Sequence, residues 1–345
     1  MSFLEAHEMP KMTIAEALRQ AIREEMNRDP RVFCLGEDIG VKGGFGGAFT
    51  VTLGLSDEFG HERILDTPIS EAGLAGVAIG AAMSGMRPIA DVQYGDFLFC
   101  MMDQLANQAA KMTYMSAGTV SVPLVMRAPV GATSRGAQHA QSLEAFFSHI
   151  PGLKVVAPST AYDAKGLLKS AVRDDNPVIV FEHKLLYGSK GPRSEKGALS
   201  PIGQVPDEDY VVPIGKGVVR REGSDVTIVG KLLTVYRALG AADKLAADGI
   251  DAEVIDPRTL VPLDKELILE SVHKTGRLVI VEEDNKTNGW ASEIAALVAE
   301  EAFFWLDAPI KRVSAPDTPA PFAPVMEQFY VPSEDRIVQA AKALF

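Results

Sequence analysis

Cysteine is almost missing from this sequence of 345 residues, and so is any long apolar run. Cys34 and Cys100 stand alone, in no spacing typical of a metal site or a redox pair, which indicates a reducing compartment. No apolar stretch reaches the length that a membrane-spanning helix needs, and the opening stretch is too polar for a secretion signal. We therefore expect the protein in the cytoplasm or an equivalent compartment.

Positive charge is also in deficit, because 34 Lys and Arg stand against 46 Asp and Glu, a formal net charge of −12. This balance argues against nucleic acid or an anionic membrane as the partner, and it leaves a basic protein partner open. What the sequence does have is apolar content, 47% of residues against 23% charged. Such a composition predicts a globular protein, and the length suffices for about two domains.

Hydrophobic patterns alternate between strand and helix along the chain. A capping box, Thr13 with Glu16, predicts the start of the first amphipathic helix. Alternating strands and helices predict parallel sheets covered on both faces, an α/β fold. Strands are predicted at residues 31–36, 63–66, 88–93, 122–128, 153–156, 178–181, 226–229, 252–255 and 278–281. Helices are predicted at residues 13–26, 71–86, 96–115, 163–172, 232–247, 264–272 and 290–303.

The clearest break in this pattern lies between Gly188 and Pro213, where Gly, Pro, Ser, Lys and Asp dominate. We predict an N-terminal domain over residues 1–187, a linker over residues 188–213 and a second α/β domain over residues 214–345.

The helix predicted over residues 71–86 has almost no bulk and no charge beyond its first residue, Glu71. Its glycines are Gly73, Gly76, Gly80 and Gly85. Each costs roughly 1 kcal/mol of helix propensity relative to alanine, so we expect them to serve the close approach of another helix or a ligand. Small or apolar residues on every side predict a helix that is buried all round. A buried carboxylate at its start would need a partner from elsewhere.

Glu71 has two interpretations. A glutamate at a helix start can simply interact with the helix dipole at a solvated first turn. The order Glu71, Gly76, Gly80, with a small or apolar residue after each glycine, resembles the pattern that marks the aminopyrimidine-binding domain of thiamine diphosphate enzymes.

Two loops add candidates. Residues 131–142 form a polar loop after a strand, and His139 is the side chain in it that titrates near neutrality, although a lone loop histidine is commonly an ordinary surface residue. Residues 40–47 (GVKGGFGG) lack the lysine of a P-loop and the spaced glycines of a dinucleotide-binding turn. We therefore interpret them as a mobile loop rather than a phosphate cradle.

Many segments, in order along nearly the whole chain, carry a resemblance to one family. They are GED at 36–38, DTPISEAG at 66–73, DF at 96–97, DQLANQAAKMTYM at 103–115, QHAQS at 138–142, HIPGLKVVAPST at 149–160, DAKGLL at 163–168, EVID at 253–256 and KTGRLVIVEED at 274–284. Together they resemble the β subunit of the thiamine diphosphate-dependent decarboxylating component of 2-oxo acid dehydrogenase complexes. So many matches are more specific than any single motif.

The resemblance implies a transketolase-like fold, an aminopyrimidine-binding domain followed by a C-terminal domain that builds the dimer interface. It also implies an α2β2 heterotetramer in which the α chain supplies the ligands of the diphosphate and Mg²⁺. In agreement, the GDG motif with its later asparagine is absent from this chain. The chain would be half of an active site, and the acyl product would pass to a lipoyl-bearing acyltransferase core.

The resemblance also implies roles for single residues. Glu71 would hydrogen-bond a ring nitrogen of the aminopyrimidine and favour the imino tautomer that removes the proton from the thiazolium carbon. Ile69, Gln93 and Phe97 would contact the cofactor. His139 would face the substrate or the acyl-transfer step.

Asp174 and Asn176 match a segment that binds potassium in some relatives, and the sequence departs from the family elsewhere. Ala140 stands where the family usually has serine, which removes any hydroxyl role there. VTIVGKLLTVY at 226–236 replaces the commoner VTIVSYG, and with DAPIKR at 307–312 it favours acetoin dehydrogenase β chains. The short GGFGG loop favours pyruvate or branched-chain enzymes.

We therefore expect a 2-oxo acid dehydrogenase β chain with pyruvate as substrate, acetoin second, and branched-chain 2-oxo acids as an alternative. A transketolase-type sugar enzyme and a non-catalytic assembly subunit are the other interpretations. The sequence does not name the substrate, because the pocket would be shared with the α chain and apolar pockets discriminate by only about 1 to 3 kcal/mol per methylene.

Overall fold

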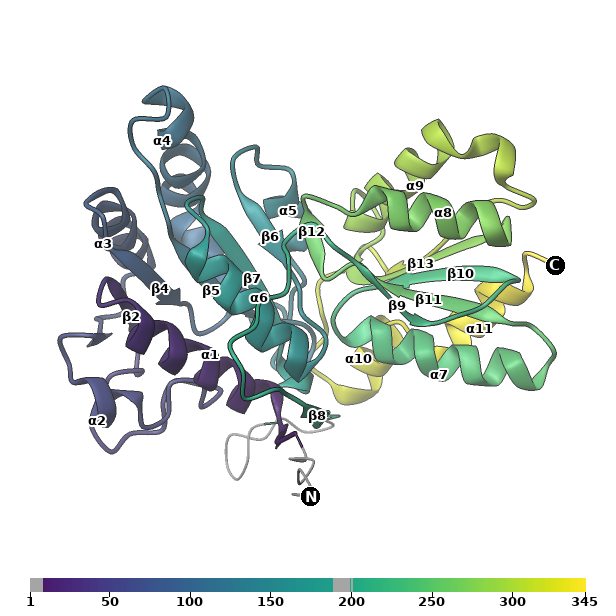
Figure 1. Cartoon of the computed structure of the whole chain (residues 1–345). Helices are drawn as coiled ribbons and strands as arrows, with labels where there is room; N and C mark the ends of the chain where they lie inside the picture. Colours follow the sequence, from purple (N-terminus) through teal and green to yellow (C-terminus); the bar gives the residue numbers. More distant parts are fainter. Residues whose placement is uncertain (1–8, 189–198, 200) are drawn as a thin grey trace, which may run out of the picture.

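Two α/β units lie side by side in the structure, a computed structural model (Figure 1). It describes residues 9–188, 199 and 201–345. Of the predicted linker, residues 189–198 and 200 lie outside the described residues, as do residues 1–8 of the predicted N-terminal domain. The α/β class predicted from the sequence is confirmed, and the domain boundaries stay a prediction.

The N-terminal unit is built on a seven-stranded sheet. Its strands are β2 (Val32–Gly36), β3 (Ile64–Asp66), β4 (Arg87–Asp91), β5 (Val125–Val130), β6 (Lys154–Val156), β7 (Val178–His183) and β12 (Thr259–Val261). Their order is β12-β6-β7-β5-β4-β2-β3, and every neighbouring pair is parallel except β12 with β6. Strands β2, β5 and β7 are buried at every residue, as a sheet covered on both faces requires.

The C-terminal unit has a five-stranded sheet of order β14-β13-β10-β11-β9, parallel except for β9 with β11. Its strands are β9 (Val218–Arg221), β10 (Val226–Gly230), β11 (Ala252–Asp256), β13 (Leu278–Asn285) and β14 (Lys311–Ala315). A two-stranded pair, β1 (Lys11–Met12) with β8 (Gly203–Gln204), joins the start of the chain to the segment between the units. All predicted strands are present, with shifted ends.

Helices cover both sheets. The α-helices are α1 (Ile14–Arg28), α2 (Leu55–Phe59), α3 (Glu71–Met83), α4 (Ala110–Met115), α5 (Glu144–Ser148), α6 (Ala161–Arg173), α7 (Leu233–Ala247), α8 (Lys265–Thr275), α9 (Trp290–Glu301), α10 (Pro324–Tyr330) and α11 (Glu334–Lys342). The capping box of α1 is confirmed, since the Glu16 amide donates to Thr13 Oγ1 at 3.2 Å and the Thr13 amide donates to Glu16 Oε2 at 2.9 Å. No helix in the described part of the chain is long and apolar enough to cross a membrane.

The prediction of a single helix over residues 96–115 is wrong. This segment is instead a 3₁₀-helix, η1 (Gly95–Met101), a π-helical stretch, η2 (Gln104–Ala109), and the short α4. The spacing of apolar residues does not distinguish 3₁₀-, π- and α-helix. These helices differ in whether each backbone amide donates to the carbonyl three, five or four residues earlier. The tighter and wider turns set the directions of the side chains around Phe97.

The prediction that the helix over residues 71–86 is buried all round is also wrong for the chain alone. Helix α3 packs on β4, η1 and η2 through one face, and the opposite face is exposed. The buried residues are Leu74, Ala75, Ala78, Ile79 and Ala82. Gly76, Val77 and Gly80 lie on the exposed face.

A buried arginine joins the central strands of the first sheet. The Arg127 guanidinium on β5 donates to both carboxylate oxygens of Glu182 on β7, at 2.9 and 2.6 Å, and to Asp91 on β4. The Tyr187 hydroxyl donates to Glu182 as well. Because these charges are paired, they are compatible with burial. They also hold β4, β5 and β7 together, and the candidate site lies beyond the carboxyl ends of β4 and β5.

Candidate active site

Three aromatic rings meet just beyond the carboxyl ends of β4 and β5. The His139 ring lies 4.9 Å from the Tyr94 ring and 5.5 Å from the Phe97 ring, centroid to centroid, with interplanar angles of 88° and 83°. Tyr94 and Phe97 follow β4, and His139 follows β5. Since β4 and β5 are parallel neighbours, their carboxyl ends share one edge of the sheet, where ligands bind in such folds.

The structure therefore brings together Phe97 and His139, two of the residues singled out in the sequence, and adds Tyr94, which was not. Lys184 strengthens the group: its Nζ donates to the His139 carbonyl and lies 5.0 Å from the centre of the Tyr94 ring. The position of Tyr94 directly after a buried strand was the available signal. Nothing local in the sequence pointed to Lys184.

Gln93 braces the glycine-rich loop over residues 40–47. Its Oε1 accepts from the Ala48 amide at 2.9 Å, and its Nε2 donates to the Glu37 carbonyl at the end of β2. Both ends of the side-chain amide are thus engaged with this chain's own backbone, which fixes the amide beside the candidate site.

Glu71 is the first residue of α3 and is partly exposed, and Ile69 just before the helix is 82% exposed. Glu37 faces it: burial raises the pKa of the Glu37 carboxyl, and the negative charge of Glu71 raises it further. Arg63, the nearest basic residue before Glu71, instead donates to the backbone carbonyls of Met26 and Val32.

Buried polar atoms without a hydrogen-bond partner lie in each segment around this group. They are Thr67 Oγ1 before α3, Asp96 Oδ2 in η1 and Thr133 Oγ1 in the loop that carries His139. Native proteins leave few such atoms unsatisfied, so their presence in all three segments fits a polar ligand or partner that approaches here. The aromatic rings and the exposed carboxylate of Glu71 fit a flat heterocycle with ring nitrogens such as an aminopyrimidine.

Asp174 and Asn176 are also brought together. The amide and Nδ2 of Asn176 donate to Asp174 Oδ1 at 2.9 and 2.8 Å, Lys154 donates to Asp174 Oδ2, and Arg87 donates to the Asp174 carbonyl at 3.0 Å. Burial raises the pKa of Asp174, but Lys154 and Asn176 outweigh it and hold the pKa below its usual value. The cations Lys154 and Arg87 thus already contact these oxygens, and potassium binding stays a prediction.

No group of three or more His, Cys, Asp or Glu residues is placed to hold a metal ion among residues 9–188, 199 and 201–345. The predicted Mg²⁺ site on an α chain is a separate prediction that this observation does not address.

Ala140, the departure from the usual serine, is 2% exposed. It packs with Ala132 of the same loop and with Ala315, Ala320 and Tyr330 of the C-terminal unit. A hydroxyl in this small apolar cluster would need a hydrogen-bond partner, so the methyl group suits its surroundings.

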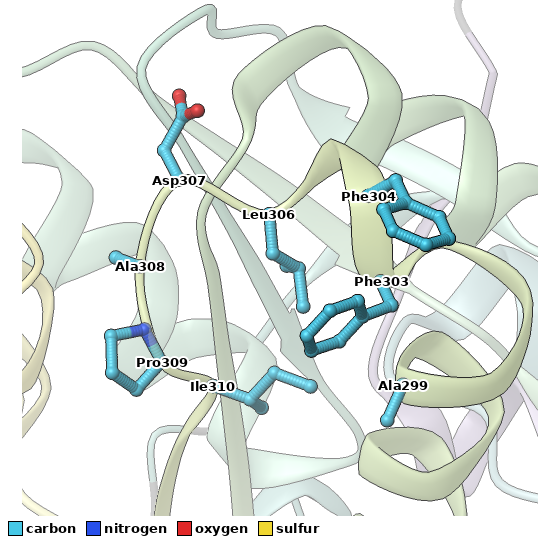
Figure 2. A pocket seen from close by; sticks show the side chains of 8 residues that line it. All are labelled: Ala299, Phe303, Phe304, Leu306, Asp307, Ala308, Pro309 and Ile310. Carbon is cyan, nitrogen blue, oxygen red and sulfur yellow. The ribbon is translucent and has the colours of Figure 1, made fainter.

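A separate apolar pocket of about 640 Å³ lies on the C-terminal unit, beside the end of α9 and the short helix η5 (Phe303–Trp305). Figure 2 shows Phe303, Leu306 and Ile310 pointing into it and Asp307 pointing away. None of the predicted site residues lines it. A ligand site needs a few convergent polar groups to fix orientation, and the side chains that point into this pocket are apolar.

Comparisons with known proteins agree with this geometry. Residues 10–190 match the family model for the transketolase pyrimidine binding domain, and residues 215–337 match the model for the transketolase C-terminal domain. A chain of the solved structure "Split gene transketolase, inactive beta4 tetramer" has a TM-score of 0.75 at 24% identity, covering 96% of this chain and 98% of that one. This likeness supports the fold.

Curated relatives are much closer in sequence. The chain is 50% identical to 2-oxoisovalerate dehydrogenase subunit beta of Bacillus subtilis, covering 97% of this chain and 99% of that one. It is 49% identical to acetoin:2,6-dichlorophenolindophenol oxidoreductase subunit beta of Cupriavidus necator (96% and 97%) and 47% identical to pyruvate dehydrogenase E1 component subunit beta of Rickettsia felis (96% and 98%). The chain therefore belongs to the transketolase family and, within it, to the E1 β subunits of the pyruvate, acetoin and 2-oxoisovalerate dehydrogenases.

Proposed function

We propose that this chain binds the aminopyrimidine half of thiamine diphosphate and, together with an α chain in an α2β2 assembly, decarboxylates a 2-oxo acid or cleaves acetoin. Pyruvate is the first candidate substrate, acetoin the second and a branched-chain 2-oxo acid the alternative. The acyl unit would pass to a lipoyl-bearing acyltransferase core. One observation carries the proposal: helix α3, which begins with Glu71, packs on η1, which carries Phe97, and the Phe97 and Tyr94 rings contact the His139 ring.

The cofactor, when bound, supplies the carbanion and accepts the electrons released with carbon dioxide. The chain's own task is to hold the ring and manage a proton. Glu71 would hydrogen-bond a ring nitrogen of the aminopyrimidine, and Glu37 lies close enough for the negative charge of Glu71 to add to burial in raising the pKa of Glu37. Phe97 and Ile69 would provide apolar contacts, and Gln93 would fix the loop beside them.

His139 would serve the substrate side. A histidine exchanges protons near neutral pH, and here the Tyr94 and Phe97 rings restrict the imidazole while Lys184 fixes its backbone carbonyl. This orientation suits a group that donates or accepts a proton at one position of a bound substrate or acyl acceptor.

The open side of the site supports an α partner. The exposed face of α3, the exposed Ile69 and the unsatisfied Thr67, Asp96 and Thr133 lie around Glu71 and His139. An α chain that covers them would also supply the ligands of the diphosphate and Mg²⁺. We therefore expect thiamine diphosphate to bind the isolated chain poorly, and tight binding in calorimetry of this chain alone would overturn that division.

The decisive experiment compares Glu71→Gln with the control Glu62→Gln, an exposed glutamate shortly before it. Turnover of the assembled α and β chains is followed by reduction of an artificial electron acceptor, with pyruvate, acetoin and branched-chain 2-oxo acids supplied separately. Loss of the titratable carboxyl group should lower turnover at least about 100-fold, with assembly intact on size-exclusion chromatography. Unchanged turnover would refute the role of Glu71. An inactive wild-type complex would favour the sugar-enzyme or assembly-subunit interpretation.

A further inference from the structure

The loop that carries His139, residues 131–142 and hereafter the His139 loop, is attached to the C-terminal unit near its start, in its first half and just after its end. The attachments come from three residues of that unit, Glu283, Glu327 and Lys231. None of them was singled out in the sequence as a site residue, and the mechanism above does not use them.

The first attachment is at the start of the loop. Glu283 on β13 accepts from the Ala132 amide at 3.3 Å and from His183 Nε2 at 3.2 Å. His183 Nδ1 accepts from the Leu185 amide, so Nε2 bears the proton that it donates to Glu283. Burial raises the pKa of Glu283, but the interactions with His183 and Ala132 outweigh it and hold the pKa below its usual value. Glu283 is therefore an ionised, fully engaged anchor.

The second attachment is in the first half of the loop. Glu327, in the first turn of α10, accepts from the Ser134 amide through Oε2 and from Ser134 Oγ through Oε1 at 3.1 Å. Ser134 has a φ of +56°, an uncommon conformation for a residue other than glycine. A two-pronged, charge-assisted contact of this kind holds a strained backbone in one position.

The third attachment follows the end of the loop. Glu144, the first residue of α5, has Oε1 3.2 Å from Lys231 Nζ, which also lies 3.2 Å from Asp284 Oδ2. All three side chains are buried. The C-terminal unit thus contacts the chain on both sides of the loop and at Ser134, five residues before His139.

We propose that Glu327 is a positioning residue for His139: by holding Ser134, it lets the C-terminal unit set where the His139 ring stands beside Phe97. The inference rests on the proposed role of His139. Glu327 does not touch the ring itself. It acts through the His139 loop, which is held at Ala132 and, just after its end, at Glu144. The contact with Ser134 therefore controls how far the first half of the loop moves between these two points.

The test uses the assembled α and β chains with Glu327→Ala, the conservative Glu327→Gln, and the control Glu301→Ala. Glu301, the last residue of α9, is an exposed glutamate of the same unit that pairs with Lys265 at the start of α8. Amide hydrogen exchange of a peptide over residues 131–142 reports the loop directly, without turnover. Steady-state kinetics separate kcat from KM.

We expect Glu327→Ala to speed exchange in the His139 loop and lower kcat, each roughly 10-fold, with KM within about 3-fold. Glu327→Gln keeps an acceptor oxygen for Ser134 and should restore part of both, and Glu301→Ala should match the wild type. Exchange at the wild-type rate in Glu327→Ala, or faster exchange with an unchanged kcat, would overturn the proposal. An inactive wild-type complex refutes the proposed function instead, and the exchange rates still decide whether Glu327 holds the loop.

Discussion

The two sides of the candidate site differ in how complete they are. On the Glu71 side, the glycines of α3 face open space: a Cβ added at Gly76 or Gly80 would meet nothing within 4 Å. On the His139 side, a Cβ added at Gly131 would lie 2.0 Å from His183 Nε2. Glycine therefore allows a close contact within the chain at Gly131, whereas Gly76 and Gly80 lie on an open surface. The chain closes the His139 side with its own contacts and leaves one face of α3 exposed.

The largest effect on this comparison should come from Gly131→Ala. Gly131 has a φ of +93°, and its added methyl group would press on the buried His183 that anchors Glu283. Backbone strain and overpacking together should lower the free energy of unfolding by roughly 3 kcal/mol. Urea unfolding of the chain, read by circular dichroism, measures it. Wild-type stability would show that the His139 side is not closed as described.

A smaller effect, confined to one pH range, is expected from Glu144→Gln. Burial, only partly offset by Lys231, raises the pKa of Glu144 from its ordinary value of 4.5 to about 7. The folded state therefore holds a proton that the unfolded chain releases, so the stability from this group is present below about pH 4.5 and is lost as the pH rises to about 7. Glutamine does not titrate. As the pH rises from about 4.5 to about 7, the urea midpoint of the variant should therefore increase relative to that of the wild type. A constant difference would contradict the assignment, and Glu62→Gln is the matched control.

The smallest effects should come from Gly76→Ala and Gly80→Ala. Neither position has a positive φ or a neighbour within the chain, so each alanine should stabilise the isolated chain by up to about 1 kcal/mol. If a partner packs closely on this face, the same changes should weaken assembly with the α chain. Thermal unfolding of the chain alone and titration with the α chain give the two numbers. Stabilisation with unchanged assembly would mean that the glycines do not face the partner.

Much of the fold was predictable because it depends on local pattern. Strand β2 and the first four residues of β7 are continuous apolar runs, and the capping box at Thr13 is local chemistry. The burial of α3 was mispredicted because small and apolar residues stand on every side of the helix and so do not tell which faces the chain itself covers. Strand β12 was missed because it stands between Pro257 and Pro262, which are typical of loops, and because its partner β6 lies about a hundred positions earlier.

The site was predictable to the extent that its residues follow strands. Phe97 and His139 meet because β4 and β5 are neighbours, which the alternation of elements already implied. Lys184, Glu283 and Glu327 could not be found in this way. Their roles depend on how the C-terminal unit docks, and no local spacing encodes contacts such as that between Ser134 and Glu327.

Strand β12 also limits how this protein can be taken apart. It comes from the C-terminal half, yet it forms the outer strand of the first sheet beside β6, and the Ala157 amide extends the pairing by donating to the Arg258 carbonyl at 2.8 Å. A fragment that ends before it would present β6 as a bare edge, a template for pairing with other copies. The two halves are thus poor building blocks for chimeras with relatives. Replacing the C-terminal half also replaces β12, which is the edge strand of the N-terminal sheet.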